Sequence, residues 1–331
     1  MHLPYAPGCT LVAGVLVGLA VASSSSAQSS GERPPHSLWA LALDANAGQA
    51  SGDPKALAVK ADPGTHALTE DGRLLAFVST RDDKTGLWLR DLSNGSETRL
   101  TTSAWPESAP VLSRDGRLVF YQSQEDEADF VCSAPTSGGS CEKECINCGH
   151  PTGASPDGGT LLLQQGFGGR ATLAALDLRS GKKSEILSDP GYGLYRGHFS
   201  PDGRFMVFHA GDANTAGQPA AREFIAPFRG LAPVPKSEWI AITDGKAYSD
   251  APRWSPDGNR LYYVADRDGS RCIWAQKLEP KSKRPAGEPV AVLHLHGPKH
   301  SLKELSLQWL DVSVGRDKLI FSLGEAEGGA W

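Results

Sequence analysis

The chain has 331 residues, and its 33 basic and 38 acidic side chains give a formal net charge of −5. This balance excludes the strongly basic surface with which many proteins bind nucleic acid. Apolar residues make up 40% of the chain, enough for a globular protein with a buried core. The 37 glycines and 23 prolines supply many turns, so the composition favours an all-β chain of short strands over long helices.

An uncharged apolar run occupies residues 9–22 near the N-terminus. It is too short to cross a bilayer as a helix, which needs about 20 residues. Ser25 and Ala27 stand at the small-residue positions of a signal-peptidase site. We therefore expect residues 1–27 to be a signal peptide cleaved after Ala27, although its first residues include no Lys or Arg. A buried strand or a misassigned start codon is the alternative.

The signal peptide predicts a periplasmic or extracellular protein, in a compartment where disulfides form. Residues 28–35 are expected to be a disordered linker that precedes the folded domain. No other stretch of the sequence reaches the length of a transmembrane helix.

One turn recurs along the rest of the chain. Five copies carry an Asp-Gly pair, and they are Asp71-Gly72, Asp115-Gly116, Asp157-Gly158, Asp202-Gly203 and Asp257-Gly258. A degenerate sixth copy occupies residues 313–316. In the S-P-D-G form, proline presets the backbone, aspartate accepts bonds from nearby amides, and glycine adopts the left-handed conformation. A ring of aspartate ligands is the alternative, but turn chemistry accounts for the pattern.

Each turn is followed by a continuous apolar run, such as residues 261–264. Such a run indicates a strand that is covered on both faces. A second polar turn, a strand with an aromatic residue and a last strand complete each unit. Four strands in about 40–45 residues are typical of a β-propeller blade. Because one blade cannot bury its own faces, the blades are expected to stack in a ring.

The repeats predict six blades of four antiparallel strands in one domain, residues 36–331. Residues 37–43 and 55–58 match the third and fourth strands of a blade, whereas residues 307–312 and 318–323 match the first and second. We expect the two chain ends to complete one blade together, which closes the ring without a free edge. Residues 330–331 are an alternative third strand. Insertions at residues 211–218 and 229–236 are expected to form loops on a face of the ring.

The turn S-P-D-G-N-R from Ser255, the R-D-G turn from Arg267 and the strand around Trp274 resemble the WD-like repeats of TolB-type six-bladed propellers. The CxxCGHPT stretch from Cys145 and REFIAPFRG from Arg222 resemble a narrower group. That group forms the extracytoplasmic part of bacterial serine/threonine kinases or of winged-helix proteins. The sequence contains no Gly-rich loop with a partnered lysine, no H-R-D and no D-F-G motif. The resemblance therefore implies a propeller without the kinase, so that a sensor role would act in trans.

Four of the cysteines lie close together in the sequence, and they are Cys132, Cys141, Cys145 and Cys148. In an exported protein we expect two local disulfides, Cys132 with Cys141 and Cys145 with Cys148. Zinc ribbons usually carry two C-x-x-C pairs and this chain has one, so a zinc site and free thiols are the alternatives. Cys272 lies in an apolar strand and is expected to be buried and unpaired.

The sequence carries no G-x-S-x-G motif of a serine hydrolase, since the nearest match, residues 153–157, belongs to a repeated turn. Residues 166–169 are glycine-rich but precede a strand, whereas a phosphate loop precedes a helix. His294, His296 and His300 are candidates for a metal site or a proton relay. No carboxylate follows them at a ligand spacing, so a solvated loop is the favoured interpretation. The acidic residues 125–129 are likewise expected to be a solvated turn.

These observations predict an exported, monomeric propeller without catalytic activity, cofactor or metal. It would bind a protein or a small ligand through its channel mouth and blade loops. The alternative is a metal-dependent lactonase or esterase with a cation in the central channel. Three or more converging Asp, Asn or Glu side chains at the axis would favour the enzyme, and a small or apolar lining would favour the binding module.

Overall fold

The structure is a computed structural model, and it describes residues 36–62, 64–102, 105–212, 221–295, 300–301 and 310–325. Residues Pro34–Trp331 form one compact unit. The expected signal peptide, the linker, residues 330–331 and residues 213–218 of the first insertion lie outside the described residues. Among the residues that the structure describes, no helix is long and apolar enough to cross a membrane.

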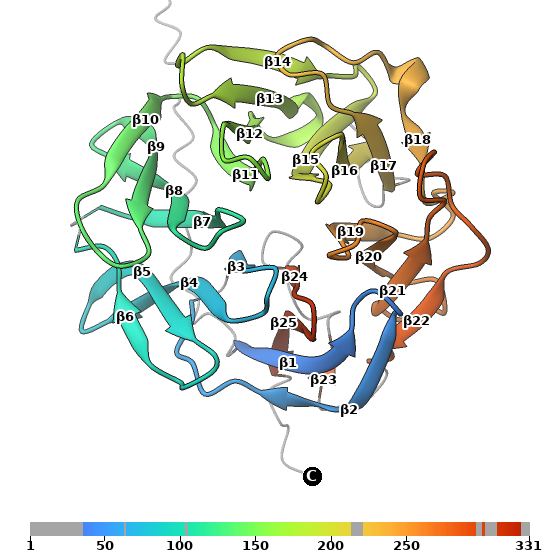
Figure 1. Ribbon diagram of the computed structural model, residues 1–331, viewed down its shortest axis with the longest axis horizontal. Helices are drawn as coiled ribbons and strands as arrows, with labels where there is room; N and C mark the ends of the chain where they lie inside the picture. The colour runs from blue at the N-terminus through green and yellow to red at the C-terminus, as the bar shows by residue number, and fades with distance from the viewer. Residues whose placement is uncertain are drawn as a thin grey trace, which may run out of the picture. The chain divides into compact units, whose positions relative to one another are not determined.

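Six antiparallel sheets are arranged in a ring, as Figure 1 shows. The predicted six-bladed β-propeller is thereby confirmed. Blade 1 comprises β3 (His66–Leu68), β4 (Leu74–Arg81), β5 (Lys84–Asp91) and β6 (Glu97–Arg99). Blade 2 comprises β7 (Glu107–Leu112), β8 (Leu118–Glu125), β9 (Ala128–Pro135) and β10 (Glu142–Ile146). Blade 3 comprises β11 (His150–Ala154), β12 (Thr160–Gln165), β13 (Thr172–Asp177) and β14 (Lys183–Leu187).

Blades 4 and 5 repeat this order from the axis outward. Blade 4 comprises β15 (Tyr192–Phe199), β16 (Phe205–Asp212), β17 (Arg222–Pro227) and β18 (Ile240–Ala241). Blade 5 comprises β19 (Ser249–Trp254), β20 (Arg260–Ala265), β21 (Cys272–Lys277) and β22 (Val290–Leu293). Two short 3-10 turns, η1 (Gly168–Arg170) and η2 (Lys236–Glu238), interrupt the loops of blades 3 and 4.

Both ends of the chain build blade 6, as the sequence predicts. The C-terminal part supplies β24 (Val312–Val314) and β25 (Lys318–Glu325), and the N-terminal part supplies β1 (His36–Asp44) and β2 (Gln49–Ala56). β1 pairs with β25 from His36 opposite Gly324 to Ala42 opposite Lys318. A short fifth strand, β23 (His300–Ser301), pairs with the end of β25 beyond β24.

Two strands of blade 6 differ in extent from the prediction. The fourth strand begins at Gln49 rather than at residue 55, because a tight hairpin after Asp44 lets pairing start at once. The first strand begins at Val312, and residues 307–309 lie outside the described part of the chain.

Each recurring turn is held by the same hydrogen bonds, as blade 4 illustrates. The Ser200 hydroxyl donates to Asp202 Oδ1 at 2.6 Å and accepts the Phe205 amide at 3.0 Å. Asp202 Oδ1 also accepts the Arg204 amide at 3.1 Å. The glycines of the five turns have φ between +68° and +75°, and they are Gly72, Gly116, Gly158, Gly203 and Gly258. The aspartate oxygens are therefore engaged within the turns.

The hydrophobic core lies between neighbouring blades. Val207 and Ile225 of blade 4 pack with Leu261 and Leu278 of blade 5, and all four side chains are buried. Because each inner sheet is covered on both faces, its strands are apolar without alternation.

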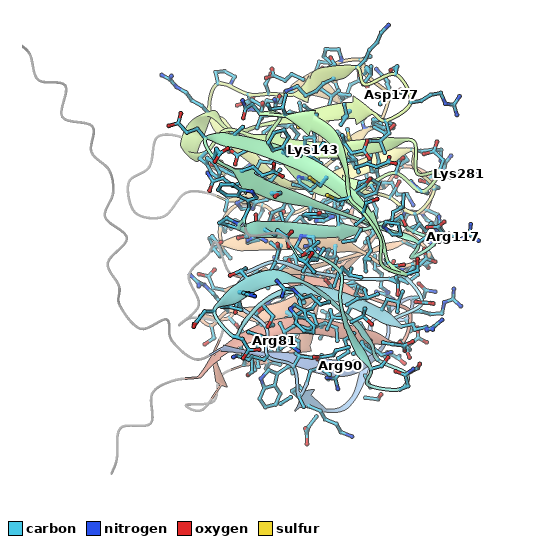
Figure 2. The ribbon with its side chains drawn as sticks, turned by 90° about the vertical axis from the view of Figure 1, so that its left-hand side faces the viewer. Arg81, Arg90, Arg117, Lys143, Asp177 and Lys281 are labelled. Atoms are coloured by element: carbon cyan, nitrogen blue, oxygen red, sulfur yellow. A yellow bond between two sulfur atoms is a disulfide. The ribbon has the colours of Figure 1, made fainter. Side chains whose placement is uncertain are left out.

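The antiparallel strands give the ring two different faces. The turns from the first to the second strand and from the third to the fourth lie on one face, here called the turn face. Figure 2 shows Arg117, Asp177 and Lys281 of such connections on the same side. The loops from the second to the third strand and the links between blades lie on the opposite, loop face.

Candidate functional site

The innermost strands are irregular where they line the axis. The register shifts in β7, β11, β15 and β19, so each of these strands contains a β-bulge. Ala109, Arg196 and Ala251 take left-handed φ values of 51°, 54° and 55° within three of them. A bulge leaves a residue unpaired and re-aims its neighbours. In β15 it lets Tyr195, Arg196 and His198 all line the channel.

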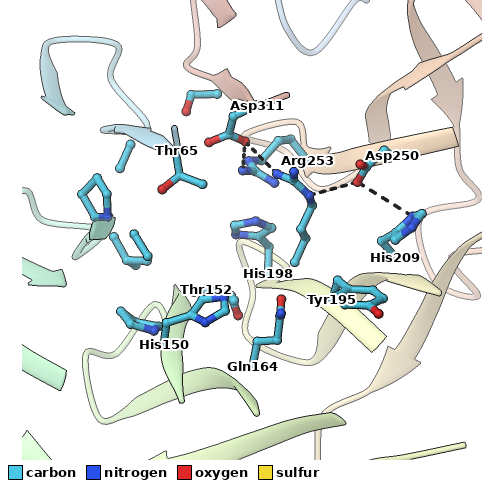
Figure 3. Close-up of a pocket in the computed structure, with 18 of the residues that line it drawn as sticks. Thr65, His150, Thr152, Gln164, Tyr195, His198, His209, Asp250, Arg253 and Asp311 are labelled. Carbon is cyan, nitrogen blue, oxygen red and sulfur yellow. Dashed lines mark hydrogen bonds and ion pairs between the residues drawn. The ribbon is translucent and has the colours of Figure 1, made fainter. Parts of the chain in front are cut away.

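All six blades line a cavity of about 640 Å³ on the axis (Figure 3). Its wall on blade 2 is small and apolar, formed by residues 109–112. The opposite wall is polar and carries Tyr248, Asp250 and Arg253 of blade 5. The cavity is therefore amphipathic across its width.

Asp311 of blade 6 is the most connected side chain of the polar wall. One of its oxygens lies 2.5 Å from Arg253 Nη2 and 3.6 Å from Arg196 Nη1. The other accepts the His66 amide at 3.1 Å and lies 3.3 Å from His66 Nδ1. Burial opposes ionisation of this carboxyl, but Arg253 and His66 outweigh it and hold the pKa of Asp311 far below its usual range.

Asp250 forms a second ionic centre. It accepts from Arg196 Nε at 3.0 Å, from the Tyr248 hydroxyl at 2.8 Å and from the Ala251 amide at 2.6 Å. Burial favours its neutral form, yet Arg196 and His209 outweigh this effect and lower the pKa of Asp250. Arg196 thus bridges the two buried carboxylates. Figure 3 shows Asp250 and Asp311 with dashed lines to their partners.

His209 is the histidine of the site that faces two carboxylates. Its Nδ1 lies 3.1 Å from Glu223 Oε1 and 3.9 Å from Asp250 Oδ1. Burial lowers the pKa of this imidazole, but the carboxylates of Asp250 and Glu223 outweigh burial and raise it above its ordinary value.

Two other histidines of the lining lie where their surroundings favour the neutral imidazole. Burial, with Arg196 nearby, lowers the pKa of His150 to about 4. Burial and Arg253 lower the pKa of His198 well below its ordinary value. The site therefore offers neutral imidazoles beside carboxylates that are already paired with guanidinium groups, and its formal charges largely cancel.

The lining matches neither the carboxylate-rich axis expected of a metal-dependent enzyme nor the small or apolar axis expected of a binding module. In the described part of the chain, the carboxylates that line the cavity are Asp250 and Asp311, and both are bound by arginines, which would repel a cation. Within the described residues, no group of three metal-ligating side chains lies on the axis. The lining is not wholly apolar either, because the apolar wall covers blade 2 and the polar wall lies opposite.

The loop-face rim of the cavity carries Phe167. This side chain is 80% exposed and its ring stacks on His150 with 6.1 Å between centroids. It belongs to the glycine-rich turn 166–169 that the sequence analysis noted. On the turn face, Arg114 of blade 2 pairs with Glu70 at 3.0 Å and donates to the Pro201 carbonyl of blade 4. Arg114 thereby spans the axis on that side.

The cysteines follow one expectation and depart from another. Cys145 and Cys148 form a disulfide, whereas Cys132 and Cys141 are free thiols in the structure. The expected second bridge is not formed in the structure: Lys143 stands directly opposite Cys132, and Cys141 lies near the Cys132 thiol as a second free thiol. Burial, with Cys141 nearby, raises the pKa of the Cys132 thiol to about 12.

Several other sequence candidates have ordinary roles. Ser155 bonds Asp157 within its turn, and Glu125 pairs with Lys143 at 2.6 Å. His296 lies outside the described residues, whereas His294 follows β22 beside Asp268, 3.0 Å away.

The sequence patterns alone did not reveal the ionisable residues of the cavity. Most of them occupy positions two to five residues before the first residue of a recurring turn, and these are His66, Arg196, His198, Asp250, Arg253 and Asp311. When the repeats are aligned on their turns, polar residues stand at these positions in strands whose other residues are apolar. Polar residues in an otherwise buried strand were the sequence feature that could have indicated the site.

No family model matches the chain. Its sequence is similar to the Tol-Pal system protein TolB of Francisella tularensis, with 26% identity over 207 residues, 61% of this chain and 45% of that protein. A structure from Agrobacterium tumefaciens, provisionally assigned to TolB, superposes with a TM-score of 0.65 at 15% identity. This match covers 88% of this chain and 99% of that one. The chain has the TolB-like propeller fold.

The TolB-like propeller spans about half the length of the curated relatives that it matches. The same fold also occurs in an oligogalacturonate lyase solved with manganese, with a TM-score of 0.51 and 15% identity over 79% of this chain and 88% of that one. Likeness at this level shows the fold alone, and a fold does not define function. The function must therefore be argued from the residues of the site.

Proposed function

We propose that this TolB-like propeller is an exported, non-catalytic scaffold that binds a protein or small ligand at the loop-face mouth of its axial cavity. The observation that carries the proposal is the cavity itself, about 640 Å³ with one apolar and one polar wall. Such a lining suits a ligand with an apolar part and hydrogen-bonding groups.

The buried charges support binding rather than reaction. A nucleophile needs a base within about 2.6–3.2 Å. Among the described residues, no serine or cysteine hydrogen bond to a histidine ring of the cavity is seen. The Ser313 hydroxyl donates to the His66 backbone carbonyl, and the His66 and His209 rings face carboxylates instead. The carboxylates Asp250 and Asp311 are in turn held by Arg196 and Arg253. These groups stabilise one another and leave no activated nucleophile.

Phe167 is the anchor that we expect at the mouth. Aromatic side chains often dominate binding energy when a partner covers them, and Phe167 is exposed beside a pocket rather than on an outer strand. The neighbouring glycines of its turn let a partner approach the backbone closely.

Export rests on the predicted signal peptide, residues 1–27. An extracytoplasmic propeller that resembles the sensor part of bacterial kinases would pass its signal to a separate protein. The proposed partner is therefore another protein of the same compartment or a ligand that the propeller delivers to it.

A pull-down from periplasmic extract tests the proposal. Tagged wild-type protein, the F167A variant and a V290A control would be compared by quantitative mass spectrometry. Val290 is also exposed but lies on the outermost strand of blade 5. We expect a protein or ligand to be enriched by wild type and V290A and reduced at least about tenfold by F167A, the effect of losing one anchoring side chain.

Enrichment that F167A leaves unchanged would contradict binding at the mouth. Turnover of lactone or ester substrates that is lost in D250N would instead favour the hydrolase alternative. Binding and turnover can be measured on the same protein preparations. Urea unfolding of each variant checks that it is folded like the wild type.

A further inference from the structure

Three metal-ligating side chains meet on blade 5, away from the axial cavity. Asp268 lies in the loop between β20 and β21, Cys272 is the first residue of β21, and His294 directly follows β22. One oxygen, sulfur or nitrogen atom of each lies within 4.8 Å of the others. Asp268 Oδ2 is 3.0 Å from His294 Nδ1 and 3.8 Å from Cys272 Sγ.

The pairing of β21 with β22 brings Cys272 and His294 together. Ile273 of β21 is opposite Leu293 of β22, so the residues at the adjoining strand ends, Cys272 and His294, are neighbours. The loop then turns back over them. Asp268 Oδ1 accepts the Ser270 amide at 3.4 Å, and Oδ2 lies toward His294 and Cys272.

The sulfur has a further contact that suits a thiolate. The Leu295 amide donates a hydrogen bond to Cys272 Sγ at 3.5 Å. A backbone N–H that points at sulfur stabilises negative charge on it. Cys272 is buried while Asp268 and His294 reach solvent, so an ion has an entry path.

The spacing matches a small tetrahedral ion. Zinc binds sulfur at about 2.3 Å and nitrogen or oxygen at about 2.0–2.2 Å, so its ligand atoms lie about 3.3–3.8 Å apart. The observed separations of 3.0 Å and 3.8 Å bracket this range. Calcium and magnesium prefer oxygen ligands only, whereas a thiolate, an imidazole and a carboxylate together favour zinc or a similar transition metal.

We propose that Asp268, Cys272 and His294 bind one divalent transition-metal ion of the zinc class, with a fourth position for water or another ligand. Binding forms three bonds to the ion and releases the thiol proton to solvent. The ion would tie the loop 266–271 to the end of β22. Arg271 of this loop lies over the Tyr248 ring, 5.3 Å from its centroid, and Tyr248 lines the axial cavity. The metal would thus steady one part of the mouth.

Cobalt titration of the purified full-length protein, with any affinity tag removed, tests the site. Cobalt takes the place of zinc and produces a thiolate charge-transfer absorption when sulfur binds it. The variants are C272S, H294Q and D268N, and C141S is the matched control because it removes an exposed thiol outside the cluster. Competition with zinc gives the affinity, and calcium serves as the oxygen-preferring control ion.

We expect one equivalent of cobalt with the charge-transfer band in wild type and in C141S. The band should vanish in C272S. Affinity should fall at least about 100-fold in H294Q and D268N, since removal of a group that merely supports a ligand already costs 10–100-fold. No stoichiometric binding by wild type, or an unchanged band in C272S, would overturn the proposal. If C272S does not fold, the two variants at exposed positions still decide it.

Discussion

The carboxylate of Asp311, in the last blade of the chain, contacts both the backbone amide and the ring of His66 in the first. The two residues are 245 positions apart in sequence. The same carboxylate binds Arg253 of blade 5. One buried side chain therefore ties together three blades at the axis, on the inner side of the strand pairing between β1 and β25.

We predict that Asp311→Asn lowers the free energy of unfolding by about 3–5 kcal/mol, because it removes the carboxylate that pairs with buried Arg253 and leaves Arg196 with Asp250 as its remaining ion-pair partner. Urea unfolding measures the effect. Asp317→Asn is the control, since Asp317 is exposed and pairs with Lys318 on the same blade; it should change stability by less than about 1 kcal/mol. Equal stability of D311N and wild type would show that the network adds nothing.

Acid should unfold the protein through the same group. The folded pKa of Asp311 is depressed, so its stabilisation is complete above the unfolded value of about 3.9 and is lost as pH falls below it. Stability should then decline by up to about 1.4 kcal/mol per pH unit from this carboxyl alone. Urea midpoints between neutral pH and pH 3 test this, and D311N should show a shallower slope than wild type. Parallel slopes would contradict the assignment.

For His209 we expect the opposite pH dependence of the free energy of unfolding, at higher pH. Its folded pKa is raised by Asp250 and Glu223 against burial, so its stabilisation is complete below the unfolded pKa of about 6.5 and is lost as pH rises through the folded value. His209→Gln should remove this decline from the pH–stability curve. His150→Gln should keep it, because His150 is already neutral. Titration of the His209 ring by NMR should give a pKa above 6.5.

The cysteines can be sorted by mass spectrometry of non-reduced tryptic peptides. Cleavage after Lys143 separates Cys132 and Cys141 from Cys145 and Cys148. We predict an internal bridge in the second peptide, and alkylation of Cys141 in the native protein but of Cys132 only after unfolding. Replacing Cys145 and Cys148 by serine should cost about 2 kcal/mol for this short loop. A bridge in the first peptide would restore the sequence expectation for Cys132.

Much of the fold could be predicted because its information is local. The turn formed by Ser200, Asp202 and Gly203 is held by hydrogen bonds between residues that are close in sequence. Each copy of the motif can therefore be recognised from the sequence alone. The number of blades and the shared blade at the chain ends then follow from counting turns and from the need to leave no free edge.

The disulfide expected at Cys132 is an example of a feature that neighbouring residues in the sequence do not determine. Whether Cys141 or Lys143 stands opposite Cys132 depends on register and on the bulge between Lys143 and Cys145. A shift of one or two residues separates a disulfide from two free thiols, and the turn pattern does not encode it.

The way in which the residues of the two sites come together lies beyond that limit. His66, Arg196, Arg253 and Asp311 come from four blades, and bulges in the inner strands aim the two middle ones at the axis. No carboxylate follows His294 at a ligand spacing in the sequence, but strand pairing and a returning loop bring Asp268 from upstream. Repeats and turns reveal themselves in neighbouring residues, whereas electrostatic partners far apart in the chain meet only once the ring has closed.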